Sequence, residues 1–177
     1  MSTPAGCSRL PALQSVLGID PGTRRLGWGV VTRNGSRLVH VAHGVIAPGD
    51  SMPLPDRLVV IERELNEVVG AHRVQCASIE TLFFHKDAQA AAKLGHARGV
   101  AMLVCARAGL ELAEYAPARV KRTLTGRGAA DKAQVAQMVR AFLGLPAAPA
   151  SDAADALALA VTHLQNALAN AHLKAVK

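Results

Sequence analysis

The sequence predicts an α/β protein in which a mixed, five-stranded sheet is flanked by helices. Two observations indicate this class. Short apolar runs bounded by turn residues are typical of strands, and longer runs with apolar residues at helical spacing are typical of helices. After the first three strands the two kinds of run alternate, as they do where helices cover a sheet. The chain has 177 residues, half of them hydrophobic, which is enough for one compact domain.

The chain is expected to open with three antiparallel strands. Each apolar run ends at a strong turn signal: the first at Asp-Pro-Gly, the second at Asn-Gly and the third at Pro-Gly. Asn-Gly between two such runs favours a tight hairpin, and Pro and Gly end strands because of their restricted or unusual backbone angles. The three predicted strands are Val16–Asp20, Leu26–Arg33 and Arg37–Ala47.

The rest of the chain predicts two further strands and five helices. In the first helix, apolar residues from Leu54 to Val69 recur at helical spacing while the glutamates lie largely off that face. The Ala-rich segment after residue 86 indicates a long helix, and Gly144 ends another. The predicted helices are Leu54–Gly70, Asp87–Ala108, Arg119–Leu124, Asp131–Leu143 and Ser151–Ala171, and the predicted strands are Val74–Glu80 and Leu110–Tyr115.

We expect one domain over residues 16–171, between a loose N-terminal tail (1–15) and a short C-terminal tail (172–177). The three cysteines are odd in number and widely spaced, with no Cys-x-x-Cys pair, which favours reduced thiols and no structural zinc. No apolar run approaches the roughly 20 residues of a membrane span, and the first residues do not resemble a signal peptide. These features predict a cytoplasmic protein without a membrane partner.

Charge is concentrated in one third of the chain. The formal net charge is +7, and residues 85–140 carry ten Lys and Arg against four acids. An excess of this kind favours a polyanionic partner, although a solvated basic surface would account equally well for the charge alone. Lys121, Arg122, Arg127 and Lys132 surround a glycine-flanked loop, which suits close approach to phosphates, and for these four we favour contact with DNA over a solvated helix end.

Four acids occupy places where a sheet of this kind would bring them together. Asp20 ends the first strand, Glu80 ends the fourth, and Asp152 and Asp155 lie three apart on one face of the last helix. Singly, each acid has an ordinary explanation as a turn, surface or helix-capping residue. Together they would repel one another unless cations neutralised them, and oxygen ligands suit Mg²⁺ or Mn²⁺. Two such ions can activate water and stabilise the leaving oxygen of a phosphodiester.

Four segments in order resemble motifs of the RuvC family of Holliday-junction resolvases: LGIDPGT at 17–23, SIETLF at 78–83, AKLGHARG at 92–99 and SDAADALA at 151–158. The resemblance implies a ribonuclease-H-like fold and a homodimer that nicks opposite strands of four-way junction DNA. It also implies a metal site for two Mg²⁺, replaceable by Mn²⁺, and a branch-migration complex of RuvA and RuvB as partner. The implied metal ligands are Asp20, Glu80, Asp152 and Asp155.

The resemblance extends to basic and aromatic residues. It assigns Lys121 and Lys132 a place beside the scissile phosphate, with Lys132 among the catalytic residues. Phe83 is implied to stack on a base near the cut, although the adjacent Phe84 leaves open which ring contacts DNA. From their spacing, Lys86 and Lys93 are interpreted as reaching a second DNA arm.

The other rings and imidazoles have no predicted functional role. We assign Trp28, Tyr115 and Phe142 to core or sheet packing, the usual environment of an aromatic ring. His40 and His43 lie three apart in a strand and are expected on opposite faces, which argues against a metal pair.

Two alternatives use the same residues. Asp20-Pro21-Gly22-Thr23 also fits the D-x-G-T hairpin of the sugar-kinase and actin type of nucleotide-binding fold, although that type requires two such domains. The second alternative is a module that binds junctions without cutting them. Four clustered acids argue against it, because without metals they would weaken binding to DNA.

Overall fold

The computed structural model describes residues 13–81 and 88–175 and contains the predicted mixed sheet. Its strand order is β3-β2-β1-β4-β5. The three N-terminal strands are antiparallel neighbours, whereas β1, β4 and β5 pair in parallel. The strands are β1 (Leu13–Asp20), β2 (Leu26–Asn34), β3 (Arg37–Ile46), β4 (Cys76–Glu80) and β5 (Glu111–Tyr115).

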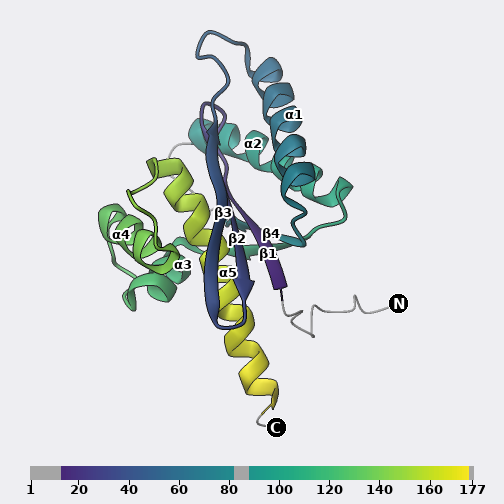
Figure 1. Ribbon diagram of the computed structural model, residues 1–177. Coiled ribbons are helices and arrows are strands. Elements are labelled where there is room, and N and C mark those ends of the chain that lie inside the picture. The colour runs from purple at the N-terminus through teal and green to yellow at the C-terminus, as the bar shows by residue number, and fades with distance from the viewer. Residues whose placement is uncertain (1–12, 82–87, 176–177) are drawn as a thin grey trace.

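Helices cover both faces of the sheet (Figure 1). One apolar core lies between the sheet and α1 and α2, and a second lies between the sheet and α3, α4 and α5. None of the helices in the described ranges has the length and apolar character needed to cross a membrane. The helices are α1 (Leu54–His72), α2 (Ala88–Arg107), α3 (Pro117–Thr125), α4 (Lys132–Leu143) and α5 (Ser151–Ala175).

Alternation along β1 determines which core each side chain joins. Leu17 and Ile19 belong to the α1/α2 core, whereas Val16 belongs to the core around α5 and Gly18 lies against the backbone of α5 at Ala156. Successive residues of a strand point to opposite faces. Asp20, two residues beyond Gly18, therefore falls on the α5 face of the sheet.

Two element bounds differ from the sequence prediction. β1 begins at Leu13, three residues before the predicted start, because the Asn34-Gly35 hairpin extends the ladder until Leu13 pairs with Asn34. Residues 13–15 therefore belong to the sheet and not to the predicted tail. At the other end, α5 continues to Ala175 instead of stopping at residue 171, since the Ala-rich sequence contains no Gly or Pro that would end it.

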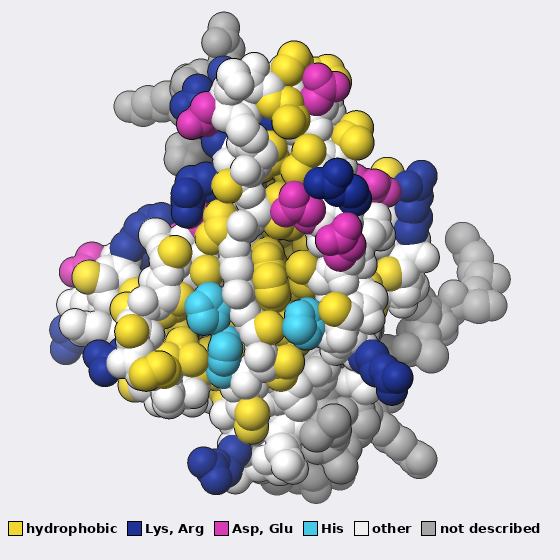
Figure 2. Space-filling view, turned by 45° about the horizontal axis from the view of Figure 1, so that its top comes forward, with side chains coloured by type: hydrophobic (Ala, Val, Ile, Leu, Met, Phe, Trp, Pro, Cys, Tyr) yellow, Lys and Arg dark blue, Asp and Glu magenta, His cyan; other side chains and the backbone are white. Residues whose placement is uncertain are grey.

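The expected opposite orientation of His40 and His43 is wrong. Val30 pairs with Ala42 and Val31 with His40, so Val41 is the extra residue of a β-bulge. A bulge reverses the alternation of side chains on either side of it, and the Nε2 atom of His40 lies 2.7 Å from the Nδ1 atom of His43. Figure 2 shows histidine side chains beside one another on the face that it displays.

The aromatic residues follow the packing prediction with one exception. Trp28 lies against Gly44 and His72, and the Tyr115 hydroxyl is 3.0 Å from Nδ1 of His163. Phe142 is 37% exposed, so its assignment to the core is wrong. The buried face of α4 is formed instead by Val135, Val139 and Leu143, and Phe142 lies off that face.

Candidate active site

Two of the four acids lie side by side at the ends of neighbouring parallel strands. β1 and β4 are in register, with Ile19 opposite Ile79, so Asp20 and Glu80 are the next residue of each strand. Both isoleucines belong to the α1/α2 core. Because side chains alternate along a strand, the two acids that follow them face α5.

The other two acids come from the start of α5. Asp152 lies in its first turn, and Asp155 is three residues further on the same face. The helix can approach the sheet this closely because the strands carry glycines beneath it. A Cβ atom on Gly27 would lie 1.9 Å from the carbonyl oxygen of Asp152, and one on Gly18 would lie 1.9 Å from that of Ala156. Gly27 is the partner of Asp20 in the β1–β2 ladder, so the start of α5 is held over the end of β1.

The four carboxylates act on one another electrostatically. Burial, the largest cause, and the negative charges of Asp155, Glu80 and Asp152 together raise the pKa of Asp20 from 3.8 to about 7, against an opposing effect of Lys132. A carboxyl group surrounded by like charges in a partly dry site favours its protonated form. Near neutral pH, Asp20 is therefore partly protonated while no cation is bound.

Basic side chains partly neutralise the helical acids. Lys132 donates a hydrogen bond from Nζ to Oδ2 of Asp155 over 2.9 Å, and this contact raises the pKa of the lysine. Arg25 donates from Nε to Oδ2 of Asp152 over 2.6 Å. With the side chains so placed, no group of three His, Cys, Asp or Glu residues within the described ranges is close enough to hold one metal ion.

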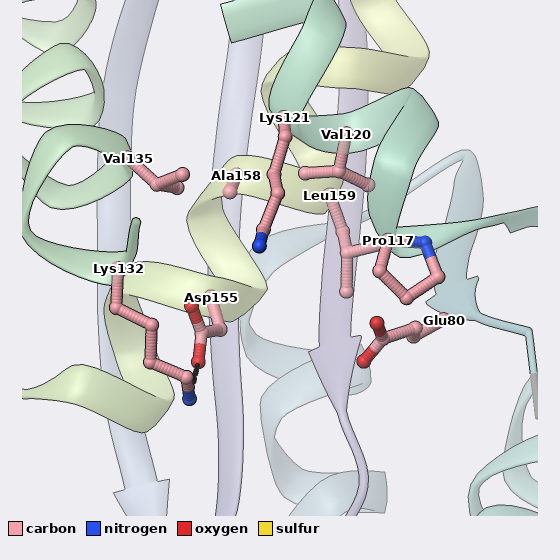
Figure 3. A pocket seen from close by; sticks show the side chains of 9 residues that line it. All are labelled: Glu80, Pro117, Val120, Lys121, Lys132, Val135, Asp155, Ala158 and Leu159. Carbon is pink, nitrogen blue, oxygen red and sulfur yellow. Dashed lines mark hydrogen bonds and ion pairs between the residues drawn. The ribbon is translucent and has the colours of Figure 1, made fainter. Parts of the chain in front are cut away.

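A cavity of about 200 Å³ lies between Glu80, at the end of β4, and Asp155 of α5. Figure 3 shows the Asp155–Lys132 contact on one side of it, Glu80 on the other, and the Lys121 amine pointing into the space between them. Its remaining walls are apolar, so the polar groups converge on one small region. The lining residues are Glu80, Pro117, Val120, Lys121, Lys132, Val135, Asp155, Ala158 and Leu159.

The lysines reach the cavity because α3 and α4 are joined by a short, ordered connection. Gly126 ends α3 with a left-handed backbone (φ 75°), and the Thr125 hydroxyl donates to the carbonyl of Lys121. Asp131 then caps α4 in a capping box with Gln134, which fixes the direction of the helix that starts with Lys132. Two segments that differ in sequence thus place one lysine each on the same cavity.

The other predicted contact residues lie elsewhere. Arg122 and Arg127 are exposed and do not line the cavity. Lys93 lines a separate pocket. Phe83, Phe84 and Lys86 fall outside the described residues. The sequence reasoning did not single out Arg25, although its place five residues after Asp20 was a signal that it would lie near the acids.

Four carboxylates gathered near the strand ends of an α/β sheet, with lysines beside them, are the arrangement expected of an enzyme that cuts phosphodiesters with metal ions. Residues 16–163 match the family described as crossover junction endodeoxyribonuclease RuvC. The chain belongs to this RuvC family. This assignment decides against the sugar-kinase and actin alternative.

Similar proteins match along most of their length. A crossover junction endodeoxyribonuclease RuvC of Sorangium cellulosum is 60% identical over 152 residues, covering 86% of this chain and 85% of the relative. One of Rhodopseudomonas palustris is 50% identical and covers 91% and 92%. A T. thermophilus RuvC solved in complex with a Holliday junction substrate has 36% identity and a TM-score of 0.84, covering 89% of this chain and 97% of that one. The ribonuclease-H-like fold implied by the resemblance is confirmed.

Proposed function

We propose that this protein is a divalent-metal-dependent endonuclease that cuts opposite strands of four-way DNA junctions at the acid cluster around Asp20. The observation that carries the proposal is the electrostatic coupling of Asp20 to Glu80, Asp152 and Asp155 beside two lysines that line one cavity. Support comes from the family and from its T. thermophilus member, solved with a Holliday junction substrate.

The acid cluster fits a hard divalent cation in its donor chemistry. Its ligands would be the carboxylates of Asp20, Glu80, Asp152 and Asp155, and all-oxygen ligand sets suit Mg²⁺, with Mn²⁺ as a substitute. The pKa of Asp20 is raised near its negative neighbours, which means that its ionised form is unfavourable there. A bound cation would remove this unfavourable interaction. Two bound ions would supply Lewis acidity and a water of lowered pKa for attack on the phosphodiester.

The chain's own residues prepare this site. Asp20 would hold a cation as a carboxylate, without its proton, and Asp152 and Asp155 would do so in place of their contacts with Arg25 and Lys132. Lys132 lines the same cavity as Lys121, and with Asp155 on a metal both amines would be able to contact the non-bridging oxygens of the scissile phosphate. The apolar wall around Val120 and Leu159 limits water at the cavity, which strengthens these electrostatic contacts.

DNA outside the cavity would meet the remaining basic residues. We place Arg122 and Arg127 on backbone phosphates next to the scissile one, because Arg122 lies in the last turn of α3 and Arg127 in the connection that leads to α4. Lys86 and Lys93 would contact a second arm. Phe83, three residues after Glu80 in the chain, would stack on a base at the crossover. Stacking of this kind contributes roughly 1–3 kcal/mol per base.

Symmetric nicking requires two active sites, and we propose that a homodimer supplies them, one from each chain. A homodimer would double the mass seen in sedimentation at the concentrations used for cleavage. The RuvA and RuvB complex as partner and a cytoplasmic location stay predictions.

Cleavage of a synthetic four-way junction tests the proposal. The protein should nick two opposite strands in Mg²⁺ or Mn²⁺ and none in EDTA, and a linear duplex of the same sequence should stay intact. Asp155→Asn serves as the inactive comparison from the same preparation. Tight junction binding without nicking in any divalent metal would favour the alternative of a non-cutting junction-binding module.

A further inference from the structure

A second, cationic pocket lies on the far side of the turn that follows Asp20. The β1–β2 turn carries two adjacent arginines with different partners. Arg25 contacts Asp152 in the acid cluster, whereas Arg24 lines a pocket of about 270 Å³ between this turn, the start of α1 and α2. The pocket, called here the cationic pocket, is lined by Thr23, Arg24, Met52, Pro53, Leu54, Arg57 and Lys93.

Three segments far apart in the chain each contribute one cation to this pocket. Arg24 comes from the turn, Arg57 from the first turns of α1, and Lys93 from α2. The acid nearest to them among the described ion pairs is Asp50, at 4.0 Å from Nε of Arg24, and both side chains of that pair are largely exposed (74% and 86%). A contact this long and this exposed neutralises little of the positive charge.

Arg57 is the most rigid of the three cations. Its Nε donates to the carbonyl of Met52 over 2.7 Å, and its Nη2 donates to that of Asp50 over 2.6 Å. These two bonds fix the guanidinium plane, and an arginine has further N–H groups to offer a ligand. A guanidinium held in place loses little side-chain freedom on binding an oxyanion, which is the property expected of a phosphate contact.

We propose that the cationic pocket binds a backbone phosphate of the junction DNA, outside the acid cluster and on the other side of the β1–β2 turn from it. This inference rests on the proposed function, because the ligand is taken from the same DNA. One turn would then serve two parts of the substrate: Arg25 at the acids and Arg24 at a further phosphate. Arg24 and Lys93 are exposed, which fits a phosphate carried by a polymer better than a free ion, because a free ion would require enclosure.

The test measures the salt dependence of junction binding in EDTA, where no cleavage occurs. Arg24→Ala combined with Lys93→Ala removes two cations that make no hydrogen bond to the loop backbone among the described contacts. Losing one phosphate contact should lower the slope of log K against log salt by about 0.9. When the salt rises from 50 to 200 mM, the affinity of the variant for the junction should therefore fall about threefold less than that of the wild type.

Arg37→Ala is the matched control. It removes one exposed positive charge from the opposite end of the strands, where Arg37 pairs with Asn34 and Asn34 with Leu13, and it should leave the slope unchanged. Arg57→Lys retains the charge and loses the fixed fork. This variant should bind the junction more weakly than the wild type. Its helix content, followed by circular dichroism, should be unchanged.

The outcomes separate this inference from the proposed function. If the wild type nicks junctions but the double variant has an unchanged slope, the proposal for the cationic pocket is wrong and the proposed function stands. If the variant lost binding of inorganic phosphate but kept its junction slope, the pocket would take a free phosphate and the DNA proposal would be wrong. If the double variant had a reduced slope but the wild type nicked no junction in any divalent metal, the cationic pocket would be supported and the proposed nuclease function would be wrong.

Discussion

Asp20, at the end of a strand, and the pair Asp152 and Asp155, at the start of a helix, bring negative charge to one site in different ways. Asp20 is partly buried, and burial together with its negative neighbours raises its pKa to about 7. The helical acids are about 30% exposed, and each accepts a hydrogen bond from a base, Arg25 or Lys132. The charge of Asp20 is thus partly neutralised by a proton, and the charges of the helical acids are partly neutralised by side-chain cations.

The difference follows from where the two kinds of position lie. The end of β1 lies between β2 and β4 with α5 packed over it, so water solvates a charge there poorly. The start of α5 faces the β1–β2 turn, which carries Arg25, and the start of α4, which carries Lys132. Binding of metal should therefore release a proton from one part of the site and displace two basic side chains from the other.

The largest expected effect is on cleavage. Asp20→Asn, Glu80→Gln and Asp155→Asn should each lower the rate of junction nicking in Mg²⁺ by at least about 100-fold, since changes to the partners of metal ligands alone cost 10–100-fold. Junction binding should stay intact or become slightly tighter, because a negative charge near phosphates is removed. Nicking rates and gel-shift affinities of the same preparations measure both.

Asp56→Asn is the control for this series, since Asp56 is likewise an acid in the first turn of a helix but is exposed and is not among the charges that shift the pKa of Asp20. It should nick at the wild-type rate. Substantial Mg²⁺-dependent nicking by any variant of the cluster would remove that residue from the ligand set and would break the comparison between the two kinds of acid.

A second effect concerns stability and its dependence on pH. Because the pKa of Asp20 is raised in the folded protein, the unfolded chain loses this proton first, and stability falls as the pH rises from about 4 through about 7. At about 1.4 kcal/mol per unit, the loss has an upper bound of about 4 kcal/mol. Asp20→Asn should abolish it, making the metal-free variant more stable than wild type at pH 8 and equal to it near pH 4.

Urea unfolding in EDTA across this pH range measures the effect. Asp155→Asn should change stability by only about 0–1 kcal/mol, the usual contribution of an exposed ion pair. Saturating Mg²⁺ should narrow the gap between wild type and Asp20→Asn, since a bound cation offsets the burial of charge. A gain in Asp20→Asn that is the same at every pH would show that burial of the charge is not its cause.

The strand acids could be predicted from the sequence more fully than the residues around them. Each ends an apolar run at a turn, and alternation within the run decides the face on which it lies. Gly18 and Gly27 were also visible as glycines within strands, which often mark a close approach of backbone. The sequence did not indicate what approaches them, because the contact with α5 joins residues more than 120 positions apart.

Other features depend on geometry that leaves no local pattern. The bulge at Val41 inserts one residue into an otherwise regular strand, and alternation alone placed His40 and His43 on opposite faces. Arg24 and Arg25 are chemically identical neighbours, and only the path of the turn decides which of them meets Asp152. The cationic pocket likewise exists only where three separate segments converge.

A smaller effect is expected on metal affinity. Arg25→Ala frees Asp152 from its ion pair, and the affinity for Mg²⁺ should rise by up to about fivefold, equivalent to the roughly 1 kcal/mol of a partly exposed pair. Arg24→Ala, the adjacent control, removes the same charge without a contact to Asp152. Calorimetric titration of the DNA-free protein measures both, and equal gains in the two variants would mean that only long-range charge matters.

The smallest effect distinguishes the two lysines of the cavity in their binding to DNA. Lys132 is held by Asp155 in the metal-free protein, whereas the Lys121 amine points into the cavity (Figure 3). In EDTA, Lys121→Ala should therefore lower the salt slope of junction binding by about one unit, and Lys132→Ala by less, since a paired lysine releases no counterion from DNA. With Ca²⁺, which takes the same oxygen ligands, Asp155 should bind the metal, and Lys132→Ala should then also lower the slope by about one unit.

Equal slopes for the two variants in EDTA would show that Lys132 leaves Asp155 for the phosphate without metal. An unchanged Lys132→Ala slope in Ca²⁺, together with lost nicking, would place Lys132 in the chemical step and not in binding.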